Sequence, residues 1–213
     1  MLYIALGDSI SIDDYSGVAN GGAASQFAAR IRAAEFRNLA YDGCFTSGVL
    51  EVMSSIDVAP DVVTLTVGGN DFLRAAFLSE GETINHMWHD AVSTTVARIN
   101  LIADGLYAWQ CPVIVNTIYD PTSGNSDQIP EMADLRAGLR AVNTGIRSAA
   151  RRRKFLLADL EAPFTGHGSA SADPWIVNEI EPSYAGSTAI AALWDDLWTG
   201  HQRDLISGSC QPG

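Results

Sequence analysis

The sequence predicts an α/β protein, a flavodoxin-like three-layer α/β/α sandwich with a five-stranded parallel sheet. Short apolar runs alternate along the chain with longer segments of helical period. The apolar runs are continuous, as expected for strands that are covered by helices on both faces of a parallel sheet. The length of 213 residues, without repeats or a linker, favours one domain over residues 1–213.

Each element follows from its local pattern. Strands are expected at residues 2–6, 35–40, 62–67, 113–117 and 155–158, and the third of these is a β-branched run, VVTLTV. Helices are expected at residues 23–34, 47–56, 83–109, 131–152 and 183–198. The segment from about residue 199 is richer in Gly, Ser and Pro and is expected to form a loose tail.

The charge balance argues against two kinds of partner. The chain has 25 acidic and 13 basic residues and a net charge of −12. Such a surface repels nucleic acid phosphates and anionic lipid headgroups. The one basic run, residues 151–154, falls at an expected helix C-terminus, where cations complement the helix dipole. This interpretation is favoured over a binding patch, so no nucleic acid or membrane partner is predicted.

No cofactor or metal is predicted either. Three cysteines, Cys44, Cys111 and Cys210, are few, odd in number and not at metal-binding spacing. His86 and His89 share one face of a predicted helix, but a zinc site would need a third ligand nearby.

The cysteine usage and the N-terminus predict a cytoplasmic protein. Few cysteines indicate a reducing compartment. No run approaches the roughly 18 apolar residues of a membrane span, and the first residues carry neither a positive n-region nor a cleavage site. The sequence makes no prediction of the oligomeric state.

Polar residues and glycines follow the first two strands, where sites of open parallel sheets form. Gly7-Asp8-Ser9 ends the first strand, and Asp8 or Ser9 could equally cap a helical turn. Gly43, after the second strand, is either a turn glycine or a position where a backbone N–H approaches a ligand. Cys44 could be a nucleophile, but a small buried hydrophobe is the favoured interpretation.

The third strand is followed by Gly68-Gly69-Asn70-Asp71. Two glycines permit a sharp turn that exposes the next side chain. The amide of Asn70 can donate a hydrogen bond to an oxyanion. Asp71 is placed to cap the helix that follows.

Taken together, these blocks resemble the SGNH hydrolase family, also called GDSL esterases and lipases. The matching blocks, in order, are GDS at 7–9, the glycine of NLAYDG at 43 and GGND at 68–71, and Tyr119-Asp120-Pro121 and the Asn143 region are also similar. The resemblance implies a hydrolase of small esters with Ser9 as the nucleophile. It also implies an oxyanion hole formed by the N–H groups of Ser9 and Gly43 and by the side chain of Asn70.

The last block departs from the family pattern, which has Asp-x-x-His before the final helix. Aligned on Pro182, the histidine position holds Glu181 and the aspartate position holds Asn178. Serine needs an adjacent base, and glutamate, with a reference pKa of about 4.3 against about 6.5 for histidine, is a weaker one unless burial raises its pKa. Glu181 and Asn178 are therefore candidate site residues, either as a coherent replacement or as a decayed site. The plain alternative for Glu181 is a carboxylate near a helix N-terminus.

Three further interpretations concern the surroundings of this site. His167, in the loop after the fifth strand, could supply the base, although a surface histidine is favoured. Asp13 and Asp14 could add negative charge at the pocket mouth or simply start a turn. The pocket wall is expected from the loops after strands three and four, with Phe72, Leu73, Phe77, Trp88 and residues 120–130.

The sequence thus predicts an SGNH-type serine hydrolase acting on a small-molecule ester through an acyl-Ser9 intermediate, with an atypical or missing general base. The alternative is a weak or inactive SGNH-fold protein that binds a carbohydrate or acyl ligand. A structural subunit is a more distant possibility, because it would have little use for all three oxyanion blocks together.

Overall fold

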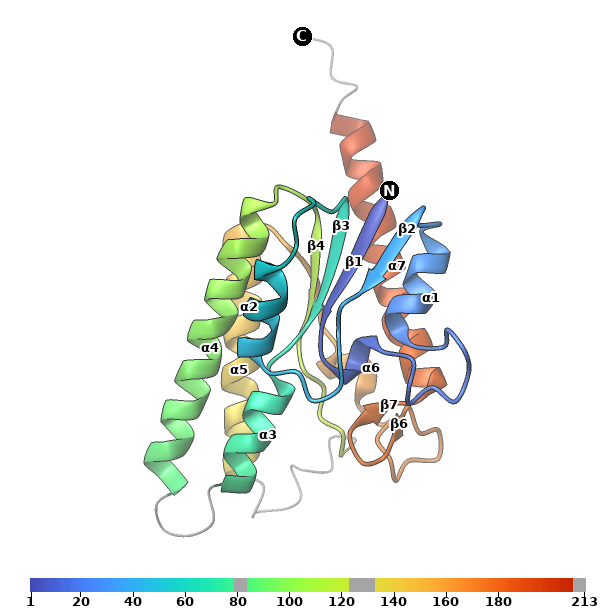
Figure 1. Cartoon of the computed structure of the whole chain (residues 1–213). Coiled ribbons are helices and arrows are strands. Elements are labelled where there is room, and N and C mark those ends of the chain that lie inside the picture. The colour runs from blue at the N-terminus through green and yellow to red at the C-terminus, as the bar shows by residue number, and fades with distance from the viewer. Residues whose placement is uncertain (79–83, 123–132, 209–213) are drawn as a thin grey trace.

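A five-stranded parallel sheet forms the centre of the molecule (Figure 1). In this computed structural model of the chain, residues 1–78, 84–122 and 133–208 are described. The sheet has the order β2-β1-β3-β4-β5, with every neighbouring pair parallel. Its strands are β1 (Leu2–Gly7), β2 (Glu35–Asn38), β3 (Val62–Thr66), β4 (Val113–Asn116) and β5 (Leu156–Ala158). This arrangement confirms the predicted fold class.

Helices cover both faces of the sheet and complete the three layers (Figure 1). One face is packed by α1 (Ala23–Arg30) and α7 (Tyr184–Gly208), which also contact each other. The other face is packed by α2 (Thr46–Ser54), α4 (Ile84–Ala108) and α5 (Ala133–Arg153), and α3 (Gly69–Leu78) packs against α4. A short 3-10 helix, η1 (Ser9–Ser11), follows β1 directly.

Burial on both faces explains why the strands are continuous apolar runs. On β1, Tyr3 and Ala5 belong to the core beneath α1 and α7, whereas Ile4 and Leu6 belong to the core on the opposite face. All four side chains have no exposed surface. The Tyr3 hydroxyl lies 2.7 Å from Oγ1 of Thr64, so its polar atom is satisfied within the core.

The hydrophobic periodicity of the sequence did not predict two features of the fold. Helix α3 begins at Gly69, inside a stretch that the sequence suggests is only a sharp turn. A short helix α6 (Glu161–Phe164) and a hairpin of β6 (Ile176–Val177) and β7 (Glu181–Pro182) follow β5, and elements of two to four residues are too short to show a period.

The predicted loose tail is wrong over residues 199–208. Helix α7 continues unbroken through Gly208, and residues 209–213 lie outside the described part of the chain. The physical reason is that the single Gly200 in this stretch weakens the helix without ending it, and no proline occurs between residue 199 and Pro212. No helix in the described ranges is long and apolar enough to cross a membrane.

The junction of β1 and β3 requires a glycine at position 7. Gly7 has a φ of +121°, and a Cβ atom there would lie 1.7 Å from the Thr66 carbonyl oxygen. The next N–H, that of Asp8, donates to the same oxygen at 3.0 Å. The two backbones therefore approach too closely for any side chain, and this approach sets where residues 8 and 9 leave the sheet.

We predict that Gly7→Ala lowers the free energy of unfolding by at least about 3 kcal/mol, because the added methyl group meets backbone rather than a movable side chain. Gly17→Ala is the matched control, because Gly17 also has positive φ (+70°) but open space around its Cβ position. It should cost only about 1 kcal/mol of backbone strain. Urea denaturation of both variants measures the difference, and equal losses would contradict the steric explanation.

Candidate active site

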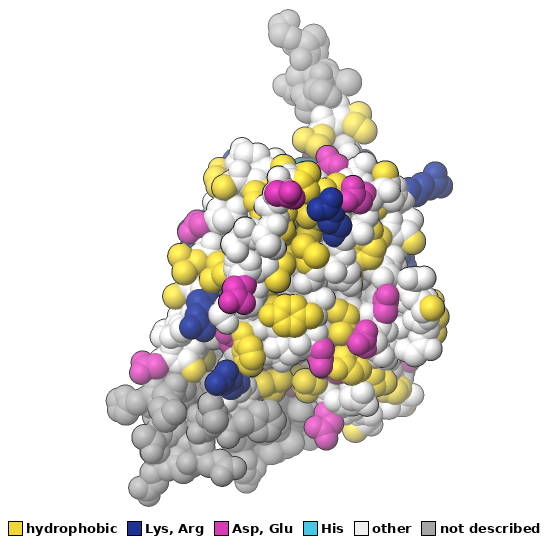
Figure 2. Space-filling view, viewed as in Figure 1, with side chains coloured by type: hydrophobic (Ala, Val, Ile, Leu, Met, Phe, Trp, Pro, Cys, Tyr) yellow, Lys and Arg dark blue, Asp and Glu magenta, His cyan; other side chains and the backbone are white. Residues whose placement is uncertain are grey.

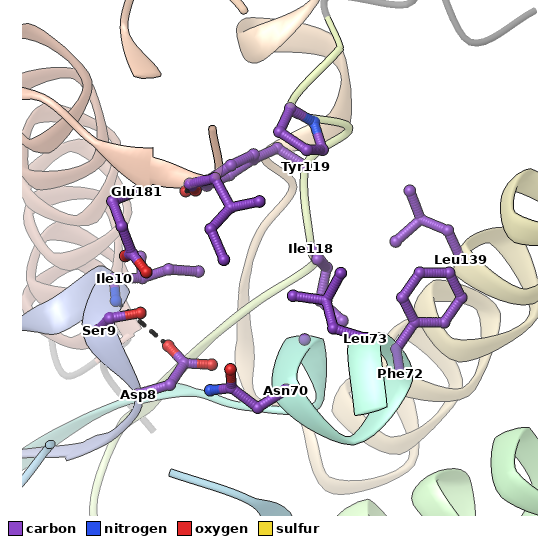
Figure 3. A pocket seen from close by; sticks show the side chains of 13 residues that line it. Asp8, Ser9, Ile10, Asn70, Phe72, Leu73, Ile118, Tyr119, Leu139 and Glu181 are labelled. Atoms are coloured by element: carbon purple, nitrogen blue, oxygen red, sulfur yellow. Dashed lines mark hydrogen bonds between the residues drawn. The ribbon is translucent and has the colours of Figure 1, made fainter. Parts of the chain in front are cut away.

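A small pocket of about 80 Å³ opens at the carboxyl ends of the central strands. One side carries the polar groups of Asp8, Ser9, Asn70 and Glu181 (Figure 3). The remaining lining is mainly apolar, with Ile10, Gly69, Phe72, Leu73, Ile118, Tyr119, Pro121, Leu139 and Ile180. The structure therefore brings together three of the five predicted site residues, Ser9, Asn70 and Glu181.

Ser9 is held at the start of η1 by the residue before it. Asp8 is the N-cap of this short helix, and its carboxylate accepts a hydrogen bond from the Ile10 N–H at 3.3 Å. The capping alternative for Asp8 is thus confirmed. Ser9 is 7% exposed, so its hydroxyl is reached only through the pocket.

The loops after β2 and β3 are tied together beside Ser9. The Asn70 amide Nδ2 donates to the Cys44 carbonyl at 3.1 Å. The carboxylate of Asp71, at the start of α3, accepts hydrogen bonds from the Thr46 N–H at 2.8 Å and from its hydroxyl at 2.6 Å. These bonds fix the segment that contains Gly43, which has a φ of +68° and does not itself line the pocket.

The Cys44 side chain belongs to the core. It is 1% exposed and packs in the cluster beneath α2 and α4. Burial raises the pKa of its thiol, which keeps the sulfur protonated. The interpretation as a small buried hydrophobe therefore fits better than that of a nucleophile.

Glu181 projects from β7 toward Ser9 (Figure 3). It is 7% exposed. Burial raises the pKa of its carboxyl group, the hydrogen bond from the Ser9 side chain opposes this rise, and the negative charge of Asp42 adds to it. A carboxylate that faces a serine hydroxyl inside a pocket is placed to receive its proton.

The hairpin that carries Glu181 is anchored by Tyr119. The Tyr119 hydroxyl donates to the Ile180 carbonyl at 2.6 Å, directly before Glu181. The Tyr119 ring stacks on Phe164 with 4.1 Å between centroids. The sequence pointed to Tyr119 only through the family resemblance, because its partner lies 61 residues further along the chain.

The structure does not bring Asn178 into the pocket. Asn178 is exposed and lies in the turn between β6 and β7, where its φ of +47° places it in the left-handed region. Asparagine tolerates this conformation well, so the residue has a structural reason to be there. A role for Asn178 in the site, as part of a coherent replacement together with Glu181, stays a prediction.

His167 also lies away from the pocket lining. Its ring stacks on Trp175 with centroids 3.9 Å apart, and its Nδ1 lies 2.9 Å from the Asp173 carbonyl oxygen. These contacts order the loop before β6. The described pocket lining contains no histidine, lysine or arginine.

Asp8, besides capping η1, is a titratable group of the pocket. It is 3% exposed, and burial raises its pKa from 3.8 to about 7. Hydrogen bonds from Thr66 and from the Ile10 N–H oppose the rise, and the charge of Glu181 adds to it. This property depends on residues far away in the sequence, so the motif alone gave no sign of it.

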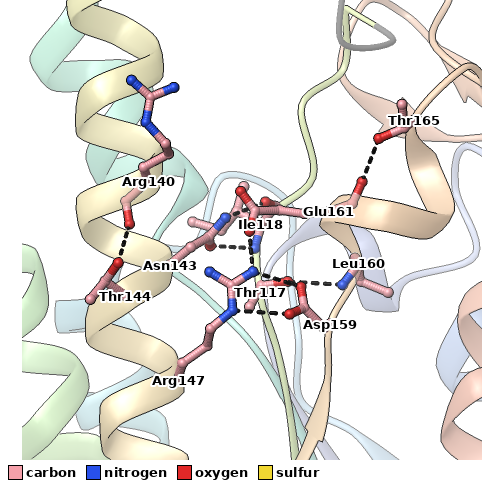
Figure 4. Close-up of polar contacts among 10 residues, drawn as sticks. All are labelled: Thr117, Ile118, Arg140, Asn143, Thr144, Arg147, Asp159, Leu160, Glu161 and Thr165. Carbon is pink, nitrogen blue, oxygen red and sulfur yellow. Dashed lines mark hydrogen bonds and ion pairs between the residues drawn. The ribbon is translucent and has the colours of Figure 1, made fainter.

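The opposite wall of the pocket is fixed by Asn143. Its side chain makes two hydrogen bonds of 2.8 Å with the backbone of Ile118, one to the N–H and one to the carbonyl (Figure 4). Next to this clasp, Arg147 pairs with Asp159 and Glu161 and ties α5 to the end of β5 (Figure 4). The shape of the apolar wall is therefore set by hydrogen bonds to main chain as well as by packing.

The predicted wall residues are found in part. Phe72 and Leu73 line the pocket as expected, and Pro121 is the described member of the 120–130 segment that does so. The side chains of Phe77 and Trp88, like residues 123–132, lie outside what the structure describes.

The surroundings of the pocket are acidic. Acidic side chains gather on the face over the hairpin end of the sheet, and no basic side chain is visible among them (Figure 2). Asp13 is part of the scaffold, since its carboxylate accepts hydrogen bonds from the Gly22 N–H at 2.8 Å and the Ser25 hydroxyl at 3.0 Å, while Asp14 is exposed. Within the described ranges, no three His, Cys, Asp or Glu side chains are grouped as metal ligands.

A parallel α/β/α sandwich with this order of blocks at its strand ends is the architecture of SGNH-type hydrolases. The sequence pattern of the GDSL-like Lipase/Acylhydrolase family matches residues 5–189, and the chain belongs to that family. The resemblance noted in the sequence is thereby confirmed. No curated protein sequence matches the chain.

Solved structures support the same fold. Phospholipase A1 from Streptomyces albidoflavus NA297 superposes with a TM-score of 0.71 at 23% identity, over 92% of this chain and 98% of that one. The lipase Lip_vut3 from a goat rumen metagenome gives 0.73 at 19%, over 92% and 97%. An acetylxylan esterase from Geobacillus stearothermophilus gives 0.68 at 17%, over 92% and 93%.

We predict that Asp8→Asn stabilises the protein at pH 8 but not at pH 4. The pKa of Asp8 is higher in the fold than in the unfolded chain, so its favourable contribution is present below about pH 4 and is lost as the pH rises to about 7. Asparagine cannot ionise, so the free energy of unfolding of Asp8→Asn at pH 8 should exceed that of wild type by on the order of 1–4 kcal/mol. Asp14→Asn, at an exposed position, is the control, and denaturant titrations at both pH values provide the measurement. If the difference in unfolding free energy between wild type and Asp8→Asn is the same at pH 4 and at pH 8, Asp8 is ionised throughout this range and the prediction is wrong.

Proposed function

We propose that the protein hydrolyses small, uncharged esters through an acyl-Ser9 intermediate, with Glu181 as general base. The observation that carries this proposal is the position of the buried Glu181 carboxylate, which faces Ser9 inside a mainly apolar pocket (Figure 3). A serine hydroxyl is a weak nucleophile until a neighbouring group takes its proton. Glu181 is the pocket residue placed to do so.

The proton returns to the substrate in the same cycle. As Oγ of Ser9 attacks the carbonyl carbon, Glu181 takes the serine proton. The protonated Glu181 then donates it to the departing alcohol oxygen as the ester C–O bond breaks. In the second half, water attacks the acyl-enzyme, Glu181 takes the proton of the water, and Ser9 recovers it when the acid leaves.

Burial is what suits Glu181 to both steps. An exposed glutamate is almost never protonated at neutral pH and would be a poor acid for the leaving group. The raised pKa of Glu181 brings its two protonation states closer in free energy. The same balance makes it a stronger base toward Ser9.

The negative charge on the carbonyl oxygen requires fixed donors. The candidates are the backbone N–H groups of Ser9 and Gly43 and the side-chain amide of Asn70. The Asn70 nitrogen carries two hydrogens, of which the bond to Cys44 uses one. Its other hydrogen is available to a carbonyl oxygen bound beside Ser9.

Two features restrict the substrate. The apolar lining includes Phe72, Leu73, Ile118 and Leu139. It suits an uncharged, short acyl or acetyl group of the substrate. The acidic surroundings oppose substrates that carry a carboxylate or phosphate near the reacting ester. Membership of the GDSL-like family fits an ester as the reacting group.

A second function, ligand binding with little or no catalysis, is favoured by one specific observation. The pocket lining that the structure describes holds no histidine, and Asn178 stands exposed in a turn rather than beside Glu181. A pocket in this state could still bind an acyl or carbohydrate ligand.

The deciding experiment uses short-chain aryl esters with wild type, Ser9→Ala, Glu181→Gln and Glu181→His. We expect Ser9→Ala to fall to background, and Glu181→Gln, which keeps the size of the side chain but cannot take a proton, to lose about 10²–10⁴-fold in kcat. Glu179→Gln, in the exposed turn of the same hairpin, is the matched control and should keep wild-type activity. Equal background rates for wild type and Ser9→Ala would contradict hydrolysis of these substrates. Activity gained only by Glu181→His would then favour the binding function.

We predict that Tyr119→Phe lowers kcat by about 5–10-fold, the equivalent of one lost hydrogen bond, with little change in KM. The hydroxyl holds the Ile180 carbonyl and thereby the position of Glu181, whereas the ring that lines the pocket is retained. Tyr184→Phe, at a 48% exposed position on α7, is the control. A raised KM with an unchanged kcat would instead assign Tyr119 to substrate binding.

A further inference from the structure

Two buried carboxyl groups share the pocket with Ser9. Asp8 is 3% exposed and Glu181 is 7% exposed, and both line the same cavity. In Figure 3 Ser9 lies between them, with Asp8 at the end of β1 and Glu181 on β7. The second carboxyl group therefore belongs to the immediate surroundings of the proposed nucleophile and base.

The pocket cannot easily hold two negative charges. Its lining is mainly apolar, and the described lining residues include no cation. Burial raises the pKa of each carboxyl group, and the charge of Glu181 further raises that of Asp8. Carboxyl groups in such a setting retain one proton between them around neutral pH and titrate as a pair.

The contacts indicate which carboxyl group carries the proton. The Ser9 side chain, which faces Glu181, lowers the pKa of Glu181 and so favours its charged form. Asp8 is the more buried of the two, and burial is the largest cause of its raised pKa. This cause outweighs the hydrogen bonds from Thr66 and from the Ile10 N–H, which favour the charged form. The charge therefore resides on Glu181 and the proton on Asp8.

We propose that Asp8 is a positioning residue that stays protonated while Ser9 reacts and so keeps the single negative charge of the pocket on Glu181. This inference rests on the proposed function and deepens it. Asp8 keeps its proton throughout the cycle, and the proton that moves is the one exchanged among Ser9, Glu181, the leaving alcohol and water. When Asp8 ionises, its charge opposes the oxyanion of each tetrahedral intermediate, and turnover falls.

The other groups that face this pair come from every neighbouring element. Three of them are neutral groups, namely Tyr15 after η1, Cys44 before α2 and Tyr119 after β4. The charged groups are Asp42 before α2, Asp14, which acts on Tyr15, and Asp71 on α3. The Asp71 carboxylate lies 3.8 Å from the guanidinium group of Arg98 on α4. The pKa values of Tyr15, Cys44 and Tyr119 are all raised, so these groups stay neutral where Asp8 titrates. Asp42 is exposed and acts on Glu181.

The test is the pH dependence of kcat/KM for a short-chain aryl ester in wild type and Asp8→Asn. Wild type should show an acid limb, where Glu181 ionises, and a fall of about tenfold per pH unit above the pKa of Asp8, about 7. Asp8→Asn keeps an acceptor for the Ile10 N–H but cannot ionise. Its acid limb should stay in place, and its kcat/KM should change less than about twofold between pH 7 and 9. A falling limb retained in Asp8→Asn overturns the proposal.

Asp42→Asn is the matched control. It removes an exposed carboxylate that acts on Glu181, so its acid limb should move to lower pH while the fall above pH 7 remains. Ser9→Ala distinguishes a failure of the proposed function from a failure of the role of Asp8. If it retains the wild-type rate, the proposed function fails, whereas a Ser9-dependent rate with an unchanged Asp8→Asn profile refutes the role of Asp8 alone.

A second measurement uses wild-type protein alone, so it depends neither on catalytic activity nor on the folding of a variant. In wild-type protein labelled with ¹³C at the aspartate carboxyl carbons, one signal should titrate with a midpoint near pH 7, the value expected for Asp8. Sequential assignment identifies that signal as residue 8. If the Asp8 signal completes its titration below pH 5, the residue is ionised at neutral pH and the proposal is wrong.

Discussion

The contact between the end of β1 and Thr66 determines where Asp8 and Ser9 lie. The Asp8 N–H donates to the Thr66 carbonyl, and the Thr66 hydroxyl contacts both the Asp8 N–H at 3.2 Å and the Ser11 hydroxyl at 3.1 Å. The absence of a side chain at Gly7 lets the two backbones come this close. The polypeptide consequently turns directly from a buried strand into η1, and Ser9 emerges at the mouth of the sheet instead of inside the core.

The same contact buries Asp8, so the packing of the fold determines the protonation of this carboxyl group. A carboxyl group placed at a strand end inside a closely packed junction cannot be solvated by water, so its neutral form is favoured. Glu181 meets a related environment from the opposite side, under the anchored hairpin. An environment that raises the pKa of a base also reduces the stability of the fold at higher pH, a cost that active sites commonly carry.

How far the sequence predicted the structure depended on how local each signal is. The five strands and the sheet class were predictable because continuous apolar runs follow from burial on both faces. Ser9 and Asn70 were predictable because each stands at a strand end after a glycine. Helix α3 was missed because Gly68 and Gly69 also suit a plain turn, and α7 exceeded its expected end because composition alone does not break a helix.

The raised pKa of Asp8 and the place of Asn178 were beyond any local pattern. Asp8 is 58 residues from Thr66, and Glu181 acts on it because the hairpin strand β7 packs against η1. Alignment on Pro182 put Asn178 at the family's aspartate position, yet its backbone conformation turns it outward. Spacing to a motif identifies a position in the chain, whereas the direction of a side chain depends on φ and ψ at that residue.

The scaffold around position 181 is independent of which side chain occupies it. The hairpin is held through main-chain groups, namely the Ile180 carbonyl bound by Tyr119 and the Ser183 N–H, which donates to the Trp175 carbonyl at 2.7 Å. Gly186 allows this approach, since a Cβ atom there would lie 2.3 Å from the Trp175 carbonyl oxygen. None of these contacts involves the Glu181 side chain. If Glu181 acts as proposed, the side chain at this position changes the group that takes the Ser9 proton and leaves these main-chain contacts in place.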